Sequence, residues 1–234
     1  IVLDEGDDLV GAALTDGNQQ IILSSAAGMA CRFLESDVRA QGRVTRGVRG
    51  MELRDSKGKL SSEIVSMSVV DPDADLLVIS ARGMGKRTHL GTGIATEDSN
   101  IVGGYRLTHR GGKGVISIRL KDNDRVVAAL QVLDAEELIM MSVRGQMVRI
   151  SVRDIRPIGR NSQGVRVMKL RKDDEITSVS LVAELTEPED ETECGEEDGP
   201  TVREPDDVTE GNQTDADGSA SGSVETGDEK TPTE

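Results

Sequence analysis

The sequence predicts an all-β protein, a propeller-like array of repeated four-stranded blades of which about four are present, followed by a disordered acidic tail. Three observations predict this architecture. Apolar runs are short, rich in β-branched residues and bounded by glycine. One hairpin pattern occurs three times along the chain, and residues 186–234 are strongly acidic with few apolar side chains.

The most regular hairpin lies between Leu138 and Val152. An apolar run, LIMMSV, leads to a turn at Arg144-Gly145, and the following MVRISV alternates apolar and polar residues. Alternation with a period of two is typical of a half-buried strand, which places Arg149 on the exposed face. We therefore expect Arg149 to face solvent or a ligand.

The same hairpin occurs twice more upstream. The segments QIILSSAAGMACRF and LLVISARGMGKRTH align with LIMMSVRGQMVRIS, so that the turn glycines Gly28, Gly83 and Gly145 coincide. We expect positive φ at these glycines, because tight hairpin turns require it. In the second unit Lys86 takes the place of Val148, which argues against burial of that strand. An arginine follows each turn glycine four residues later; these are Arg32, Arg87 and Arg149.

Each unit closes with a Gly-Val pair, at Gly47, Gly114 and Gly164. The interval from turn glycine to closing glycine is 19 residues in the first and third units and 31 in the second, which indicates an insertion at roughly Gly91–Thr108. We predict that this insertion is a loop and that Tyr105 within it is an ordinary loop residue. A second arginine precedes each closing glycine by four residues; these are Arg43, Arg110 and Arg160. Two arginines per unit in register favour a binding rim over a solvated strand face.

The strands around these hairpins follow a further pattern, in which an acidic turn separates two apolar runs. The first example, IVLDEGDDLVGAALTDG, predicts strands at Ile1–Leu3 and Leu9–Leu14. The pattern recurs at 115–134 and 165–185. From these strands we predict a folded domain over 1–185. Its blades are expected at approximately 1–50, 51–114, 115–164 and 165–185, the last together with N-terminal strands.

The charge of the chain is divided unevenly. Residues 1–185 contain 26 Lys+Arg and 25 Asp+Glu, whereas residues 186–234 contain 2 and 18. A tail of this composition cannot bury enough apolar surface to offset its loss of conformational entropy, so we predict that 186–234 is disordered. It is either a solubilising extension or a mimic of DNA that competes for the basic surface of its own chain. Between residues 31 and 172 the charge balance is +10.

Few other site chemistries fit the sequence. The two cysteines, Cys31 and Cys194, and the two histidines, His89 and His109, have neither disulfide-framework nor metal-ligand spacing. The near absence of aromatic residues weakens the case for single-stranded nucleic acid bound by stacking. We predict a cytoplasmic protein without a membrane segment, and a start within an apolar run favours a fragment of a longer protein.

Several segments resemble the C-terminal domain of the A subunit of bacterial DNA gyrase. They are LTDGNQQIILSSAAGMACRFLESDVRAQGRVTRGVRGMEL, GKRT at 85–88, KGVISI at 113–118 and GRNSQGV at 159–165, and the resemblance covers nearly all of 1–185. It implies a β-pinwheel of six blades whose basic rim wraps DNA, with about the last four blades present here. The segment THRGGKG shares RGGKG with the box that governs wrapping in the first blade of that family. We interpret Arg110 and Lys113 as the equivalent loop of a later blade.

The resemblance also implies a part in ATP-dependent negative supercoiling by a type II DNA topoisomerase. This segment would be non-catalytic and bind no cofactor, because the catalytic tyrosine region and the parts that use ATP and Mg lie outside it. The implied partners are double-stranded DNA and, through the missing regions, the gyrase B subunit together with a second A subunit in an A2B2 heterotetramer, located in the nucleoid. Two alternatives stay open: the C-terminal domain of the A subunit of topoisomerase IV, and a β-propeller scaffold for protein interactions, which the basic balance disfavours.

The candidate DNA contacts combine the in-register arginines with neighbouring basic residues. Contacts of this kind to phosphate supply affinity without reading the base sequence. In chain order, the predicted DNA-binding residues are Arg32, Arg43, Arg46, Arg87, Arg110, Lys113, Arg149, Arg156 and Arg160.

Overall fold

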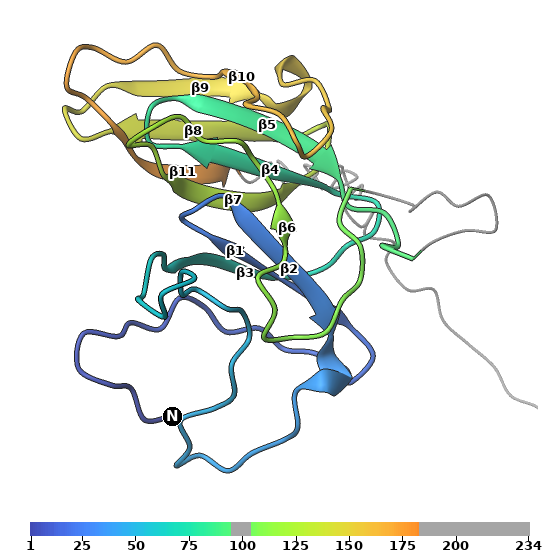
Figure 1. Ribbon diagram of the computed structural model, residues 1–234. Helices are drawn as coiled ribbons and strands as arrows, with labels where there is room; N and C mark the ends of the chain where they lie inside the picture. The colour runs from blue at the N-terminus through green and yellow to red at the C-terminus, as the bar shows by residue number, and fades with distance from the viewer. Residues whose placement is uncertain (95–103, 183–234) are drawn as a thin grey trace, which may run out of the picture. The chain divides into compact units, whose positions relative to one another are not determined.

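The computed structural model describes residues 1–94 and 104–182, all of which belong to one compact unit, Ile1–Glu187. These residues form antiparallel sheets with two short 3-10 turns, and none of their helical turns is long and apolar enough to cross a membrane (Figure 1). The strands are β1 (Gln20–Ser25), β2 (Met29–Leu34), β3 (Ile64–Val69), β4 (Asp75–Ser80), β5 (Met84–His89), β6 (Val115–Ile116), β7 (Val126–Val132), β8 (Glu137–Ser142), β9 (Met147–Ser151), β10 (Val165–Arg166) and β11 (Ile176–Val182). The 3-10 turns are η1 (Glu35–Asp37) and η2 (Val152–Asp154).

The described strands make up three sheets, with the orders β3-β1-β2-β6, β10-β5-β4-β7 and β11-β8-β9. Each sheet contains one of the predicted hairpins, β1–β2, β4–β5 or β8–β9. The prediction of an all-β, propeller-like fold is confirmed. The strands that flank each hairpin come from later in the chain, so each sheet takes strands from two or three of the ranges expected as blades. Those ranges are 1–50, 51–114, 115–164 and 165–185.

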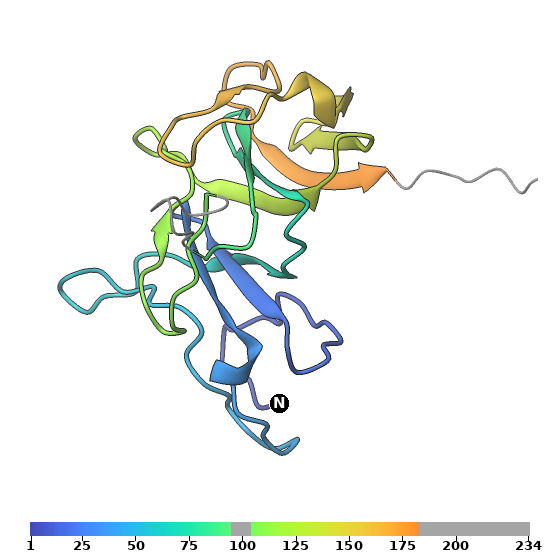
Figure 2. The ribbon, with the colours of Figure 1, turned by 90° about the vertical axis from the view of Figure 1, so that its right-hand side faces the viewer.

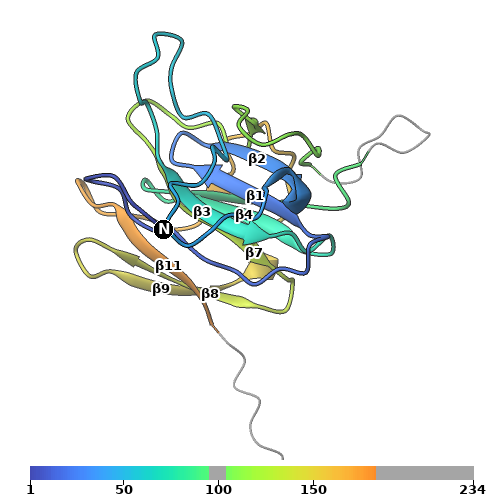
Figure 3. The same cartoon turned by 90° about the horizontal axis from the view of Figure 1, so that it is seen from below.

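Two core clusters lie between successive sheets, which follow one another from β1–β2 at one end of the unit to β8–β9 at the other (Figures 2 and 3). A third cluster packs Ile21, Cys31 and Phe33 of the first sheet against Met51. Alternate residues of β4 pack on opposite sides of the second sheet, one set toward the first sheet and the other toward the third. Leu76 and Val78 pack with Ile22 against the first sheet, whereas Leu77 and Ile79 pack against the third. A strand buried on both faces explains why LLVIS is a continuous apolar run.

The three hairpins share one geometry. The turn glycines Gly28, Gly83 and Gly145 have φ values of 76°, 81° and 79°, which confirms the prediction of positive φ. The arginine four residues later stands opposite an aliphatic residue of the first strand in every hairpin. These cross-strand pairs are Ile22 with Arg32, Leu77 with Arg87 and Ile139 with Arg149.

The N-terminal runs Ile1–Leu3 and Leu9–Leu14 form no strands, so the sequence prediction was wrong there. The corresponding runs at 115–134 and 165–185 form strands because each finds a hairpin of an adjacent sheet to pair with. Among the described residues, the N-terminal runs have no such neighbour, and Leu14 is fully exposed.

A 16-residue repeat joins the sheets. The segments 38–53, 105–120 and 155–170 align without gaps as VRAQGRVTRGVRGMEL, YRLTHRGGKGVISIRL and IRPIGRNSQGVRVMKL. We call them docking segments, because the second and third lie along the outer strand of a hairpin from an earlier unit. In the second, Val115 pairs with Ala30 of β2. In the third, Val165 pairs with Gly85 of β5.

Glycines on both sides of these contacts let the two backbones approach closely. A Cβ atom on Gly114 would collide with the carbonyl oxygen of Ala30, and one on Gly28 would lie 2.7 Å from that of Ile118. The equivalent collisions one sheet further are Gly164 with Gly85 and Gly83 with Met168. The glycines of the sequence pattern are therefore needed for close approach as well as for positive φ.

Arg32 is buried, so its predicted place on an exposed rim was wrong. Its guanidinium donates to the carbonyl oxygens of Leu90 at 2.7 Å, Gly91 at 2.7 Å and Tyr105 at 3.2 Å, and to the side chain of Gln20 at 2.7 Å. The second docking segment covers the face that strand alternation assigned to solvent. Burial lowers the pKa of Arg32 to about 10.

Arg87 has the same position one sheet further, and its predicted exposure was also wrong. Its Nε donates to the carbonyl oxygen of Ile155 in the third docking segment. The guanidinium forms ion pairs with Asp75, at 3.2 Å, and with Asp134. We call Arg32 and Arg87 the latch arginines, because each joins a hairpin to the docking segment that covers it.

Arg149 is exposed, as predicted, and forms an ion pair with Glu137 of the neighbouring strand. Met147 is exposed and Val152 is buried, in agreement with the predicted alternation. Among residues 1–94 and 104–182, no docking segment covers β9, and this accounts for the difference between Arg149 and the two latch arginines.

Tyr105 is fully buried, so its assignment as an ordinary loop residue was wrong. It opens the second docking segment, and its hydroxyl shares a 2.7 Å hydrogen bond with Ser117. Burial raises the pKa of Tyr105 to about 12. Residues 95–103 of the loop expected at roughly Gly91–Thr108, and the tail at 186–234 expected to be disordered, fall outside the described residues.

The turn glycines provide a first test of the docking contacts. Gly83→Ala and Gly145→Ala introduce the same left-handed strain, worth about 1–2 kcal/mol. Only Gly83 also faces a carbonyl, whereas nothing lies within 4 Å of a Cβ atom on Gly145. We expect urea unfolding to show a clearly larger loss in the free energy of unfolding for Gly83→Ala than for Gly145→Ala. Equal losses would mean that close approach at Gly83 does not matter, and full stability of Gly145→Ala would contradict the turn geometry.

Lys86 provides a pH test. It is fully buried in β5 and donates to the Gly159 carbonyl at 2.9 Å, so the expectation that this strand is exposed was wrong. Burial, with a smaller effect of the Arg160 charge, lowers the pKa of Lys86 from 10.5 to about 8. Between these two pH values the unfolded chain binds a proton that the folded chain lacks, so stability should rise with pH. The free energy of unfolding, measured relative to Lys86→Met, should increase across this window. A constant difference would show that Lys86 titrates normally.

Candidate nucleic-acid interface

The docking segments concentrate basic side chains. Each carries four Lys or Arg residues, and Glu52 is the one acidic residue among all three. The second segment contributes β6 to the first sheet and the third contributes β10 to the second, so a basic residue at a shared position recurs from one of these sheets to the next. These residues are Arg39, Arg43, Arg46 and Arg49, then Arg106, Arg110, Lys113 and Arg119, then Arg156, Arg160, Arg166 and Lys169.

One shared position carries an exposed arginine in all three segments. Arg39, Arg106 and Arg156 stand eight residues before the closing glycines, and all three are exposed. In the second and third segments each follows a buried residue, Tyr105 or Ile155, which fixes the backbone beside it. We call these three residues the outer arginine row. Sequence reasoning found Arg156 and missed the other two, although their constant distance from the closing glycine was a usable signal.

At the position four residues before the closing glycine, two of the three arginines donate hydrogen bonds to backbone carbonyls. Arg43 is exposed. Arg110 is partly buried, and its guanidinium donates to the carbonyl oxygens of Asp37 at 2.8 Å and Arg49 at 3.0 Å. Arg160 is also partly buried and donates to the Ile116 carbonyl at 3.4 Å. Contacts to backbone carbonyls leave the positive charge of both residues uncompensated, so they contribute to a basic surface while holding two segments together.

The remaining predicted residues are exposed. Lys113 and Arg46 precede their closing glycines by one residue, and both are exposed. Arg46 pairs with Asp4 at 2.6 Å, and Arg149 pairs with Glu137. Exposed ion pairs of this kind are worth little, so phosphate can replace the carboxylate at small cost.

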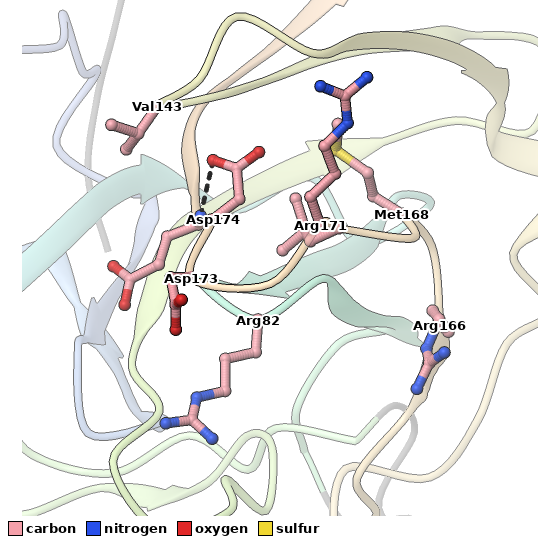
Figure 4. Close-up of a pocket in the computed structure, with 9 residues that line it drawn as sticks. Arg82, Val143, Arg166, Met168, Arg171, Asp173 and Asp174 are labelled. Carbon is pink, nitrogen blue, oxygen red and sulfur yellow. Dashed lines mark hydrogen bonds between the residues drawn. The ribbon is translucent and has the colours of Figure 1, made fainter.

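A hollow of about 720 Å³ at the hairpin-turn end of the second sheet was not anticipated from the sequence. Its lining includes Arg82, Arg166 and Arg171, but the guanidinium groups of Arg82 and Arg171 point away from one another (Figure 4). Asp173 and Asp174 share the lining and offset the positive charge. The hollow therefore does not gather cations around one ligand, and the repeated docking segments are the stronger candidate interface.

The chain matches a family whose description is the DNA gyrase C-terminal domain, β-propeller, at residues 19–71, 74–92, 102–132 and 136–183. It is 39% identical over 190 residues to the DNA gyrase A subunit of Pseudomonas aeruginosa, covering 81% of this chain and 19% of that one. The DNA gyrase A subunit of Escherichia coli K12 is 37% identical over 191 residues, with 81% and 20% covered. The chain thus spans about a fifth of the length of these relatives.

Two solved structures have the same fold. The C-terminal domain of DNA topoisomerase IV matches with a TM-score of 0.65 and 28% identity, covering 77% of this chain and 52% of that one. A DNA gyrase A C-terminal domain matches with a TM-score of 0.63 and 26% identity, covering 78% and 57%. With the family match across more than half of its residues, the chain belongs to the DNA gyrase C-terminal domain family of β-propellers.

Proposed function

We propose that the docking segments form a binding surface for double-stranded DNA and that the folded unit bends the duplex around it. The observation that carries this proposal is the outer arginine row, Arg39, Arg106 and Arg156, which repeats an exposed cation once per docking segment. Arg110 and Arg160 add charge beside it from the same segments. Arg32 and Arg87 are excluded, because both are buried.

A repeated row of this kind suits phosphate and not base edges. Each neutralised phosphate releases counterions, which supplies affinity that is independent of sequence and sensitive to salt. Bending a short duplex costs on the order of 1–10 kcal/mol, and many phosphate contacts spread over successive sheets can jointly offset that cost. The expected activity is wrapping with little base specificity.

In the longer protein, we infer that this wrapping supports ATP-dependent negative supercoiling by a gyrase assembled from two A and two B subunits in the nucleoid. The match to relatives that are gyrase A subunits supports this inference. Cleavage, ATP and Mg would belong to parts of the longer protein outside this chain. A part in topoisomerase IV is the second candidate, favoured by the structural match to its C-terminal domain. Supercoiling of relaxed plasmid by the assembled holoenzyme separates the two.

The outer arginine row can be tested by a triple substitution, Arg39→Gln, Arg106→Gln and Arg156→Gln, in the 234-residue chain. Binding to a short duplex should weaken for all sequences, and the slope of log K against log salt should fall by about 2.7, or about 0.9 for each lost phosphate contact. Fluorescence anisotropy over a salt series measures both quantities.

The matched control removes three exposed lysines outside the docking segments, Lys57, Lys59 and Lys172, by substitution with Gln. It changes the net charge by the same amount and should leave the salt slope nearly unchanged. If both triple variants lose the same affinity and the same slope, binding depends on net charge alone and the proposed row has no special part in it.

A further inference from the structure

The second docking segment lies between the other two and is joined to each by the same backbone contact. On one side the amide of its Arg119 donates to the Ser162 carbonyl at 2.8 Å, and on the other the Glu52 amide donates to the carbonyl of its Gly112 at 2.9 Å. Both bonds connect the fifteenth residue of one segment to the eighth residue of the next. Segment 105–120 therefore has a docking segment of this chain on either side.

His109 gives this middle segment a side chain that the other two lack. The equivalent residues are Gly42 and Gly159. The His109 side chain is 96% exposed, and its Nδ1 lies 3.3 Å from Oδ2 of Asp37 in η1. This contact orients the ring through Nδ1, and Nε2 on the other side of the ring stays accessible to a ligand.

His109 shares a surface hollow of about 310 Å³ with Asp37 and Arg110, which complete its lining. Arg110 is fixed in position, because its Nε donates to the Asp37 carbonyl oxygen at 2.8 Å and its Nη1 to that of Arg49 at 3.0 Å. These bonds use two of the five N–H groups of a guanidinium. The hollow thus presents a positioned arginine, with further donors, beside an exposed imidazole.

The net charge of this hollow depends on one proton. With His109 neutral, the Asp37 carboxylate offsets the Arg110 cation, whereas with His109 protonated the three side chains sum to +1. Histidine is the side chain whose charge ordinarily changes between about pH 5 and 8. The other titratable group beside His109 is Cys31 of β2, whose Sγ lies 3.8 Å from the His109 carbonyl oxygen. Burial raises the pKa of the Cys31 thiol, so it stays neutral over this range.

We propose that His109 and Arg110 bind one phosphate group of the DNA backbone in this hollow, and that protonation of His109 turns the contact on. The inference rests on the proposed DNA-binding surface and adds to it a residue that sequence reasoning left out. Nε2 of the protonated ring and the remaining N–H groups of Arg110 donate to phosphate oxygens. Hydrogen bonds between charged partners are stronger than neutral ones. Because the charge of a phosphodiester is constant over this range, DNA binding tightens as pH falls.

His89 of β5 is a matched control. Its Nδ1 also lies 3.3 Å from an aspartate oxygen, Oδ1 of Asp75, but it stands outside the docking segments. The charged residues that line the hollow beside it are three aspartates and one arginine: Asp73, Asp75, Asp134 and Arg87. Three carboxylates against one guanidinium leave this hollow anionic even when His89 is protonated. It should therefore not bind phosphate at either pH.

The test measures binding of a short duplex to the 234-residue chain by fluorescence anisotropy, over a salt series at about pH 8 and about pH 6. In the wild type, one more phosphate contact at the lower pH should steepen the slope of log K against log salt by about 0.9, which corresponds to about 8-fold tighter binding at about 0.1 M salt.

Three variants assign this response to one residue. His109→Gln should lose the pH difference in slope, whereas His89→Gln should keep it. His109→Arg carries a permanent charge, so at the higher pH it should bind as the wild type binds at the lower pH. Other groups that gain protons over this range, such as Lys86 with its pKa of about 8, are common to all four proteins. The differences between proteins therefore report on His109.

A pH difference in slope that persists in His109→Gln overturns the inference, and so does a wild type that shows none while its binding stays salt-dependent. Both results leave the proposed DNA-binding surface standing. Absence of salt-dependent binding at both pH values would overturn that surface together with the inference.

Proton uptake provides a second measurement. Because protonation and phosphate binding are reciprocally linked, calorimetry at about pH 7 in two buffers of different ionisation enthalpy should show that the wild type takes up protons on binding DNA. His109→Gln should take up fewer protons than the wild type, and His89→Gln as many. Equal uptake by the wild type and His109→Gln would contradict the proposed contact.

Discussion

The arrangement of the sheets depends on how a buried guanidinium is satisfied. Removing a cation from water is costly unless its donors find acceptors, and Arg32 finds three carbonyl oxygens and the side chain of Gln20. Arg87 meets the same requirement with the Ile155 carbonyl and two carboxylates. One acceptor of each guanidinium, the Tyr105 or the Ile155 carbonyl, comes from a docking segment of a different unit, and Leu90 and Gly91 follow β5 of the second sheet. The latch therefore forms only when these segments are correctly placed against the hairpin. It therefore specifies how one sheet sits against the next.

This constraint separates two sets of arginines that look alike in the sequence. The arginines in the hairpin strands are buried, and their guanidinium groups bind acceptors inside the protein, wherever a docking segment covers the strand. In the second and third docking segments the first residue, Tyr105 or Ile155, is buried and the arginine that follows it is exposed. Tyr105 and Arg106 are an example: the first is a buried anchor, and the adjacent arginine is an exposed cation. The same docking segments therefore contribute buried residues to the core and exposed arginines to a basic surface.

Much of this architecture could be predicted from local patterns. Short β-branched runs and turn glycines identify the hairpins, because strand period and positive φ are properties of the chain itself. Whether a polar strand face meets water depends on a neighbour distant in sequence, so alternation predicted Arg149 correctly and Arg32 and Arg87 wrongly. Tyr105 was missed for the same reason, since a residue in a glycine-rich insertion gives no sign that it anchors a docking segment.

The most direct measurement of the central claim compares three single substitutions at one repeated position: Arg32→Met, Arg87→Met and Arg149→Met. Equilibrium unfolding in urea should show losses of several kcal/mol for the first two: Arg32→Met leaves buried carbonyl acceptors without a donor, at about 1–3 kcal/mol each, and Arg87→Met breaks a buried ion pair, at about 3–5 kcal/mol. The third should lose less than about 1 kcal/mol, because it removes only an exposed ion pair. Similar losses at all three positions, or little loss at Arg32 and Arg87, would contradict the claim that latch arginines hold the sheets together.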